Sequence, residues 1–137
     1  MSTPRTALHI IHGYNEPFLS LSNQYSRALQ SDGWRVITVY LSGKPDTAIR
    51  QNTVADAVIF FDASEKKMKG LKLGLIMRVR KLIQQHQVTL LVAQRYKPLY
   101  LALLGSAGST IPVIGVAHAF GVLKNRARRC LLRLFRQ

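Results

Sequence analysis

Short unbroken apolar runs alternate along the chain with longer segments in which apolar residues recur at helical spacing. Such runs are typical of strands that are buried on both faces of a sheet. We expect strands at residues 7–11, 36–41, 57–61, 88–93 and 113–117. No internal repeat or low-complexity segment interrupts this order, so the pattern predicts one continuous domain, residues 1–137.

The segments between these strands mostly predict helices. One is expected at residues 20–30, with Leu21, Tyr25, Ala28 and Leu29 on one apolar face and Asp32-Gly33 at its end. A long amphipathic helix follows residues 64–69 and ends near residue 85, with an apolar face of Leu75, Ile76, Val79, Leu82 and Ile83. Two more are expected at residues 98–104 and 122–136. The loop before the third strand, which contains Asn52 and Thr53, receives no assignment.

Buried strands that are separated by helices predict a parallel sheet with helices on both faces. Because crossover connections are right-handed, the expected fold is α/β, a Rossmann-like three-layer sandwich with a doubly wound parallel sheet. Ligands of such folds lie at the carboxyl ends of the strands. The fold therefore directs attention to the residues that follow each strand.

The composition adds a strong positive charge. The 137 residues include 20 Lys and Arg against 6 Asp and Glu, a formal net charge of +14, so we expect an anionic partner. A single cysteine, Cys130, excludes an intramolecular disulfide, and the first residues lack the features of a secretory signal, which favours the cytoplasm. Residues 99–123 carry no charge, but Gly105–Thr110 and Pro112 favour a turn between two short elements over a membrane span.

Several common site motifs are absent from the sequence. Gly13 stands alone after the first strand, where a dinucleotide site needs three glycines, and the chain holds neither a P-loop nor a nucleophile elbow. The histidines do not show metal-ligand spacing. We therefore expect neither a cofactor nor a bound metal.

The four histidines fall into two groups. His9 lies within the first strand, which favours a core residue, and His86 ends a helix, where it suits the helix dipole. His12 and His118 both follow strands, and either could act as a base or stabilise a developing charge.

Two charged residues near strand ends have alternative interpretations. Glu16 could orient a sugar hydroxyl or pair with an arginine, or it could be a carboxylate near a helix N-terminus. Arg95, which precedes Tyr96, could bind a phosphate through two parallel hydrogen bonds, or it could be a surface charge.

Basic residues cluster on the long helix and on the last one. The first cluster comprises Lys66, Lys67, Lys69, Lys72, Arg78, Arg80 and Lys81. On the last helix, no acid interrupts Lys124, Arg126, Arg128, Arg129, Arg133 and Arg136. Basic residues opposite an apolar stripe predict a helix on an anionic membrane surface, with a core-packed helix as the alternative. The sequence carries no nucleic-acid-binding signature, so nucleic acid is not an expected partner.

Three segments carry a resemblance to a known family. They are residues 9–16, HIIHGYNE, residues 36–40, VITVY, and residues 111–121, IPVIGVAHAFG. The third segment directly precedes the last predicted helix, which is basic. Together they resemble the N-terminal lobe of GT-B type glycosyltransferases, in particular the retaining family of lipopolysaccharide and other bacterial surface-glycan enzymes. Two departures are that the fourth strand leads to Gln94-Arg95 rather than to a histidine, and that the first loop holds fewer glycines.

The resemblance implies transfer of a sugar from a nucleotide-sugar to a glycan or lipid-linked acceptor. The family's cleft histidine falls on His118, which becomes the expected catalytic residue. Acceptor-binding residues are expected to be Gly13, Tyr14, Asn15, Glu16, Arg95, Tyr96 and Phe120. Lys124, Arg126, Arg128, Arg129 and Arg133 are expected to contact the membrane, on the cytoplasmic face of the inner membrane.

A GT-B enzyme has two lobes, and the second holds most of the nucleotide-sugar, which is a co-substrate rather than a cofactor. This chain accounts for the first lobe, so a second lobe or a partner chain is expected to supply the rest, and we expect the chain to be inactive alone. The alternative is a non-enzymatic Rossmann-like binding module for a nucleotide, a nucleic acid or a partner protein.

Overall fold

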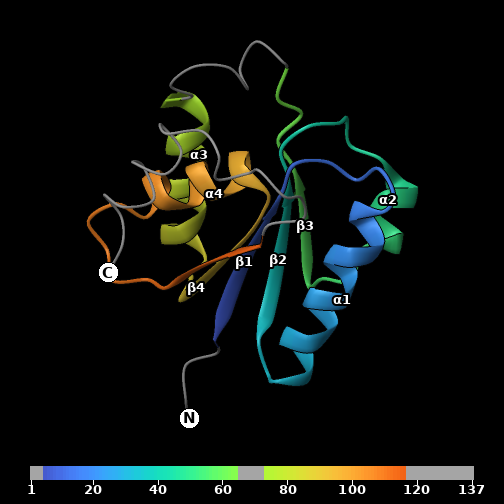
Figure 1. Cartoon of the computed structure of the whole chain (residues 1–137), viewed down its shortest axis with the longest axis horizontal. Coiled ribbons are helices and arrows are strands. Elements are labelled where there is room, and N and C mark those ends of the chain that lie inside the picture. The colour runs from blue at the N-terminus through green and yellow to red at the C-terminus, as the bar shows by residue number, and fades with distance from the viewer. Residues whose placement is uncertain (1–4, 65–72, 117–137) are drawn as a thin grey trace.

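A computed structural model of the chain describes residues 5–64 and 73–116 (Figure 1). Its strands are β1 (Thr6–Ile11), β2 (Arg35–Tyr40), β3 (Ala57–Phe60), β4 (Leu90–Gln94) and β5 (Val113–Val116). They form one sheet in the order β3-β2-β1-β4-β5, and every neighbouring pair is parallel. The expected α/β, Rossmann-like fold is confirmed.

Helices cover both faces of this sheet. They are α1 (Phe18–Ser31), α2 (Thr47–Asn52), α3 (Leu73–Gln85) and α4 (Tyr96–Gly105). Figure 1 shows α1 and α2 on one side of the strands and α3 and α4 on the other. Each helix runs back from the carboxyl end of one strand to the amino end of the next, so the loops after the strands share one edge of the sheet.

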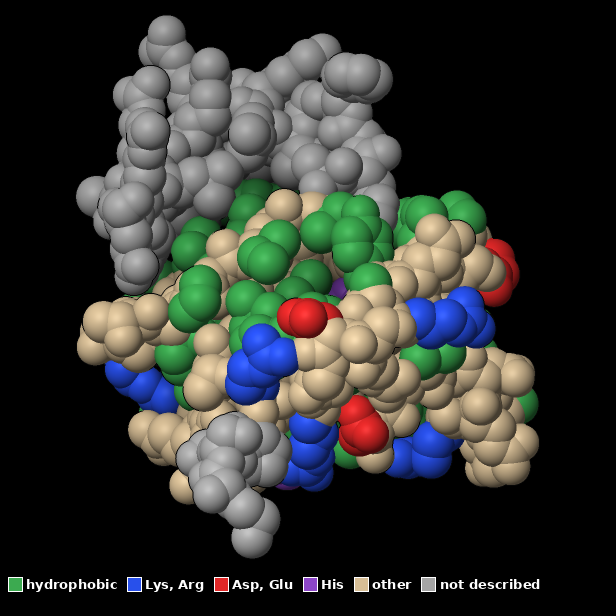
Figure 2. All heavy atoms as spheres, turned by 90° about the horizontal axis from the view of Figure 1, so that it is seen from below, with side chains coloured by type: hydrophobic (Ala, Val, Ile, Leu, Met, Phe, Trp, Pro, Cys, Tyr) green, Lys and Arg blue, Asp and Glu red, His purple; other side chains and the backbone are tan. Residues whose placement is uncertain are grey.

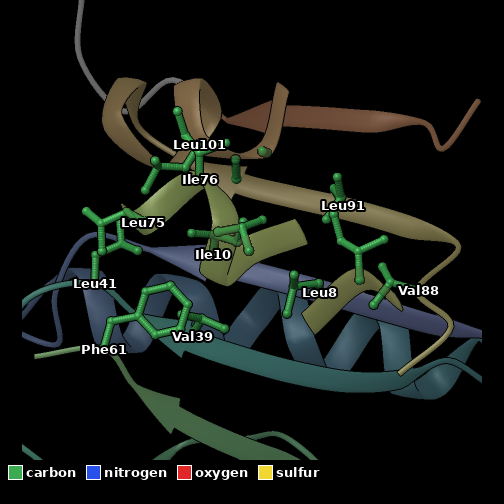
Figure 3. Packing of buried hydrophobic residues seen from close by; sticks show 14 of the residues in the cluster. Leu8, Ile10, Val39, Leu41, Phe61, Leu75, Ile76, Val88, Leu91 and Leu101 are labelled. Carbon is green, nitrogen blue, oxygen red and sulfur yellow. The ribbon is translucent and has the colours of Figure 1, made fainter. Parts of the chain in front are cut away.

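The larger part of the core lies between the sheet and the pair α3 and α4. Leu8 and Ile10 of β1 and Leu91 of β4 meet Ile76 and Leu101 there (Figure 3). Four of the five apolar positions predicted for the long helix are buried, and Leu82 is half-buried, which confirms its apolar face.

A glycine sets how closely α3 and α4 approach each other. A Cβ at Gly105 of α4 would lie 2.7 Å from Cγ1 of Val79 on α3, closer than carbon atoms pack. The two helices therefore depend on hydrogen at this position for their close packing.

The predicted inward face of α1 is wrong for Tyr25 and Ala28, which are exposed, whereas Leu21 and Leu29 are half-buried and Leu29 packs against the core. Leu19, Ser22, Asn23 and Ser26 are buried, whereas Tyr25 is 40% exposed. The buried polar groups have partners: Asn23 donates through Nδ2 to the carbonyl of Asn52 at 2.9 Å, and its Oδ1 accepts from the amide of Val54 at 2.9 Å. The helix is oriented by these hydrogen bonds, which apolar periodicity alone does not reveal.

The loop between β2 and β3, for which the sequence predicted no element, contains α2, which begins after Asp46. The Asp46 carboxylate accepts from the amide of Ile49 at 3.0 Å and so caps the first turn. Thr53, at the end of the helix, shares a hydrogen bond of 2.7 Å with the Tyr40 hydroxyl. Asn52 and Thr53 therefore have structural partners on α1 and β2.

Among the other element boundaries that differ from the prediction are those of α4 and β4. The helix α4 begins at Tyr96 rather than at Pro98, because a proline fits anywhere in a first turn, where amide groups have no partner within the helix. Strand β4 begins at Leu90, two residues after the expected position. Val88 is buried all the same, and its amide donates to Ile83 in the turn that ends α3.

Residues 99–116, the described part of the uncharged segment, divide into a helix and a strand as expected. The helix α4 ends at Gly105, a turn follows, and β5 begins at Val113. None of the helices within residues 5–64 and 73–116 combines the length and the apolar composition that a bilayer span requires. Figure 2, a view from below Figure 1, shows Lys and Arg side chains spread over that face rather than gathered in one cluster.

Candidate functional site

The order of the strands creates a switch point between β1 and β4. From β1 the chain adds β2 and β3 on one side, and β4 and β5 then extend the sheet on the other side. The loops that leave β1 and β4 therefore diverge to opposite faces, and in open parallel sheets ligands bind at such a point, beyond the carboxyl ends of the strands. The residues that follow these two strands are thus the first candidates.

His12 and Arg95 leave the sheet side by side at this point. Ile10 of β1 pairs with Ala93 of β4, and each candidate lies two residues further along its own strand. Arg95 has a φ of 73°, in the left-handed region that costs a non-glycine residue about 1 kcal/mol or more. Its amide donates to the carbonyl of Val116 at 2.8 Å, which helps to hold this conformation.

The Arg95 side chain extends from β4 towards α1. Its guanidinium carbon lies 4.9 Å from the centre of the Phe18 ring, at the first residue of α1, and the side chain is exposed. A guanidinium over an aromatic face keeps its hydrogen-bond donors at the edge, available to a further ligand.

His12 is half-buried, and its backbone is fixed to the neighbouring loop. Its carbonyl accepts from the amide of Ser42 at 2.8 Å. Its Nδ1 atom is buried and has no hydrogen-bond partner among the residues that the structure describes. Burial, together with the nearby charges of Arg95 and Lys97, lowers the pKa of the imidazole below its usual value.

Tyr14 joins the loop after β1 to the loop after β2. Its hydroxyl donates to the carbonyl of Lys44 at 3.1 Å, and its ring meets that of Tyr40 edge-on at 5.5 Å between centres. Gly43, at a φ of 105°, lies under the same ring, and a Cβ there would be 2.6 Å from it. These contacts hold Tyr14 in place at the carboxyl edge.

Glu16 caps the start of α1. Its carboxylate accepts from the hydroxyl of Ser20 at 2.8 and 2.9 Å and from the amide of Ser20 at 3.3 Å. The position fits the interpretation of a carboxylate near a helix N-terminus. Asn15, just before it, is exposed, and its carbonyl accepts from the amide of Phe18.

Gly13 has open space where a side chain would be. A Cβ there would meet no atom nearer than the Ser42 carbonyl oxygen, at 3.9 Å, and its backbone does not have a positive φ. Neither packing nor backbone geometry within the described residues therefore requires glycine here. A site at which another molecule approaches the backbone closely would require it.

Tyr96 and Lys97 lie in the first turn of α4. The Tyr96 ring is half-buried and tilted against that of Tyr100, with 6.3 Å between centres, whereas Lys97 is exposed. The sequence predicted His12 as a candidate base at a strand end, whereas it did not indicate Lys97 as a site residue. Their proximity depends on strand register, which the sequence does not give.

A buried polar chain lies beneath the switch point. His9 is fully buried, with Nδ1 3.1 Å from the hydroxyl of Ser26 and Nε2 2.9 Å from Nε2 of Gln94. Because an amide nitrogen can only donate, Nε2 of His9 accepts and Nδ1 carries the proton that is donated to Ser26. Burial lowers the pKa of His9 to about 4, so the ring is neutral at pH 7, and the prediction of a core histidine is confirmed.

Other expected site residues lie outside the described residues. These are His118, Phe120 and the basic residues Lys124, Arg126, Arg128, Arg129 and Arg133. Among residues 5–64 and 73–116, no three His, Cys, Asp or Glu side chains are close enough to share a metal ion. The site described above therefore consists of His12, Gly13, Tyr14, Asn15, Glu16, Arg95, Tyr96 and Lys97, which we call the switch-point site.

Comparison with known proteins adds a family assignment. Residues 23–137 match Glycosyltransferase Family 4. No curated protein matches the sequence. Among solved structures, a mutant enoyl thioester reductase from Candida tropicalis is 17% identical with a TM-score of 0.43, and the match covers 97% of this chain and 43% of that one.

A second solved structure gives a similar result. The mitochondrial 2-enoyl thioester reductase heterodimer from Candida tropicalis is 16% identical with a TM-score of 0.42, over 97% of this chain and 43% of that one. This chain thus spans less than half the length of either reductase. Likenesses at this level carry no argument about function.

Proposed function

Because this chain belongs to glycosyltransferase family 4, we propose that it is the acceptor-side lobe of an enzyme that transfers a sugar from a nucleotide-sugar to a glycan or lipid-linked acceptor. The switch-point site would bind the acceptor. His118 is the proposed catalytic residue, on the resemblance of residues 111–121 to the family's cleft segment.

The observation that carries this proposal is the gathering of polar residues where β1 and β4 diverge. Tyr14, Asn15 and Glu16 come from one loop, and Arg95 and Tyr96 come from the other. Sugars are bound by hydrogen bonds to planar polar groups and by contact with aromatic rings, and both kinds of group are present here. Phe120 is proposed to contribute a further ring from the segment after β5.

The open space beside Gly13 offers a direct test of acceptor binding. Gly13→Leu should place a side chain where the acceptor approaches while leaving the packing intact, because a Cβ there meets no close atom. We expect the native chain to bind members of an array of bacterial glycans and lipid-linked oligosaccharides, and Gly13→Leu to lose about tenfold or more of that affinity.

The matched control is Ala28→Leu, which places the same side chain at an exposed position of α1. It should bind as the native chain does. If the native chain binds no member of the array, or if Gly13→Leu and Ala28→Leu bind equally well, the switch-point site is not the acceptor site.

We also propose that the basic segment of residues 122–136 holds the lobe on an anionic membrane surface, on the cytoplasmic face of the inner membrane. This places the chain where lipid-linked acceptors of surface glycans are found. The net charge of +14 supports attraction to anionic lipid, although it would equally attract nucleic acid. A binding module without enzymatic activity remains the competing proposal, and vesicle and nucleic-acid binding separate the two.

Sugar transfer is proposed to need donor-binding groups from a second lobe. The 137-residue chain, incubated with nucleotide-sugars and acceptors, should therefore release no nucleoside diphosphate above background. Transfer by this chain alone would contradict that part of the proposal, because it would require the donor site to lie on these residues.

A further inference from the structure

The His12 imidazole has a free nitrogen on a backbone that is held in place. The carbonyl of the same residue accepts from the amide of Ser42, so the loop holds the backbone of His12 at the end of β1. Its Nδ1 is shielded from solvent and unpaired within the described residues, and a buried polar atom without a partner costs free energy. A turn of the ring that brings this nitrogen to a ligand oxygen would remove that cost.

Two permanent positive charges act on the same ring. Arg95 stands beside His12 through the β1–β4 register, and Lys97 follows in the first turn of α4. The pKa of His12 is lowered first by burial and then by the charges of Arg95 and Lys97. The acidic residue of the same loop, Glu16, is bound to Ser20.

We propose that His12, Arg95 and Lys97 bind the phosphoryl group of a phosphorylated acceptor. The identification of the ligand as an acceptor rests on the proposed function, whereas the preference for a phosphoryl group rests on these three side chains. A metal cation would be repelled by Arg95 and Lys97.

A phosphate monoester fits the set better than a carboxylate does. It carries roughly two negative charges and has three oxygens, which can accept from an imidazole, a guanidinium and an ammonium group together. A carboxylate has only two oxygens, and a guanidinium alone can occupy both. The monoester could belong to a soluble sugar phosphate or to a lipid-linked phosphate.

Inorganic phosphate is the probe for the first experiment. NMR spectra of the histidine ring protons of the full 137-residue chain are recorded across pH, with phosphate or with chloride at equal ionic strength. A bound dianion stabilises the imidazolium, so the pKa of His12 should rise in phosphate. His86 follows α3 at the opposite edge of the sheet and serves as the internal reference.

Arginine variants test whether Arg95 takes part. Arg95→Gln should weaken the phosphate effect on His12 about tenfold or more, because a charge-assisted pair of hydrogen bonds is lost. Arg95→Lys should restore part of it. Arg80→Gln is the matched control, since Arg80 is also exposed but binds the carbonyl of Ala107 at the far end of α4. Equal shifts at His12 and His86, no shift, or equal effects of R95Q and R80Q would overturn the proposal.

Two further ligands identify the source of the phosphoryl group. A soluble hexose phosphate and a polyprenyl phosphate in neutral phosphatidylcholine vesicles are compared with inorganic phosphate. The true acceptor class should shift His12 at a lower concentration than inorganic phosphate does. If neither ester does so, the phosphoryl group does not belong to an acceptor.

The two proposals fail separately. Loss of glycan binding in the array with an intact phosphate effect would leave the phosphoryl site standing and remove the proposed function. Glycan binding without a phosphate effect at His12 would do the reverse.

Discussion

At the scale of single residues, two glycines near the switch-point site illustrate opposite reasons for glycine. Gly43 has a φ of 105° and lies under the Tyr14 ring, so both its backbone and its surroundings exclude a side chain. Gly13 has neither constraint. The first glycine serves the fold, and the second is free to serve a ligand.

Stability measurements should separate these roles. Gly43→Ala should lower the free energy of unfolding by about 1–3 kcal/mol, because the added methyl group meets Tyr14 and the backbone is strained. Gly13→Ala should change it by less than about 0.5 kcal/mol. Urea unfolding of the two variants measures both values, and a large loss for Gly13→Ala would mean that the glycine is structural.

His9 gives the stability of the fold a pH dependence. In the unfolded chain the ring takes up a proton near its ordinary pKa of 6.5, whereas in the fold it does so only near 4. Between these values the unfolded state binds more protons, so the free energy of unfolding falls as pH drops from 6.5 to 4. A difference of this size corresponds to about 3 kcal/mol.

The measurement is urea unfolding at several pH values between 4 and 7. His9→Asn should flatten much of the slope, although it also lowers stability at neutral pH through the lost hydrogen bonds to Ser26 and Gln94. His86→Gln should keep the native slope. If His9→Asn keeps it too, His9 is not the group responsible.

At the scale of elements, α1 is held by polar contacts that its sequence pattern hides. Leu21, Tyr25 and Ala28 suggest an apolar face, yet Ser22, Asn23 and Ser26 are the residues turned inward. Asn23 bonds to the end of α2 and to the loop that follows it, Ser26 bonds to the buried His9, and the hydroxyl of Ser22 donates to the Leu19 carbonyl within the helix. The inward orientation of a polar helix face can be predicted only when the groups to which it hydrogen-bonds are known.

Asn23 should therefore matter more to stability than Tyr25 does. Asn23→Ala leaves the Asn52 carbonyl and the Val54 amide without their partner, so it should cost about 2 kcal/mol. Tyr25→Ala, on the exposed side of the same helix, should cost less than about 0.5 kcal/mol. Thermal and urea unfolding of the two variants test this, and a larger loss for Tyr25→Ala would restore the apolar face.

The strands were predictable because each is a short apolar run; β1, β2 and β4 are buried in the sheet as expected, whereas β5, at its edge, is not, and Ile114 is 50% exposed. The helix α2 was not, because six residues show no clear period, although Asp46 three residues before Ile49 is a capping signal that could have located it. For the site, strand-end position identified Arg95 and Tyr14. The pairing of His12 with Arg95 required the β1–β4 register, which no local pattern encodes.

At the scale of the whole molecule, positive charge is the dominant feature. Twenty basic residues stand against six acidic ones, and the described Lys and Arg side chains that are visible in Figure 2 are spread over that face. Dispersed charge gives long-range attraction to an anionic surface rather than one binding groove. The choice between a membrane and a nucleic acid therefore depends on the last basic segment.

Sedimentation with lipid vesicles should resolve this choice. We expect the chain to bind vesicles that contain anionic lipid and not neutral ones, with binding weakened at high salt. Neutralising Arg128, Arg129 and Arg133 together should release the chain from anionic vesicles. Neutralising Arg5, Arg27 and Arg35 removes the same charge elsewhere in the chain and should not release it. Tight, salt-sensitive binding to nucleic acid without vesicle binding would favour the binding-module proposal.

Arg95 also joins the two helical layers mechanically. Its backbone begins α4 on one face of the sheet, and its side chain lies on Phe18, where α1 begins on the other face. An anion bound to this guanidinium would restrain both the start of α4 and the contact with Phe18 at the start of α1. Amide hydrogen exchange should then slow in the first turns of α1 and α4 in the same titration, so that occupancy of one edge tightens helices that do not touch the same side of the sheet.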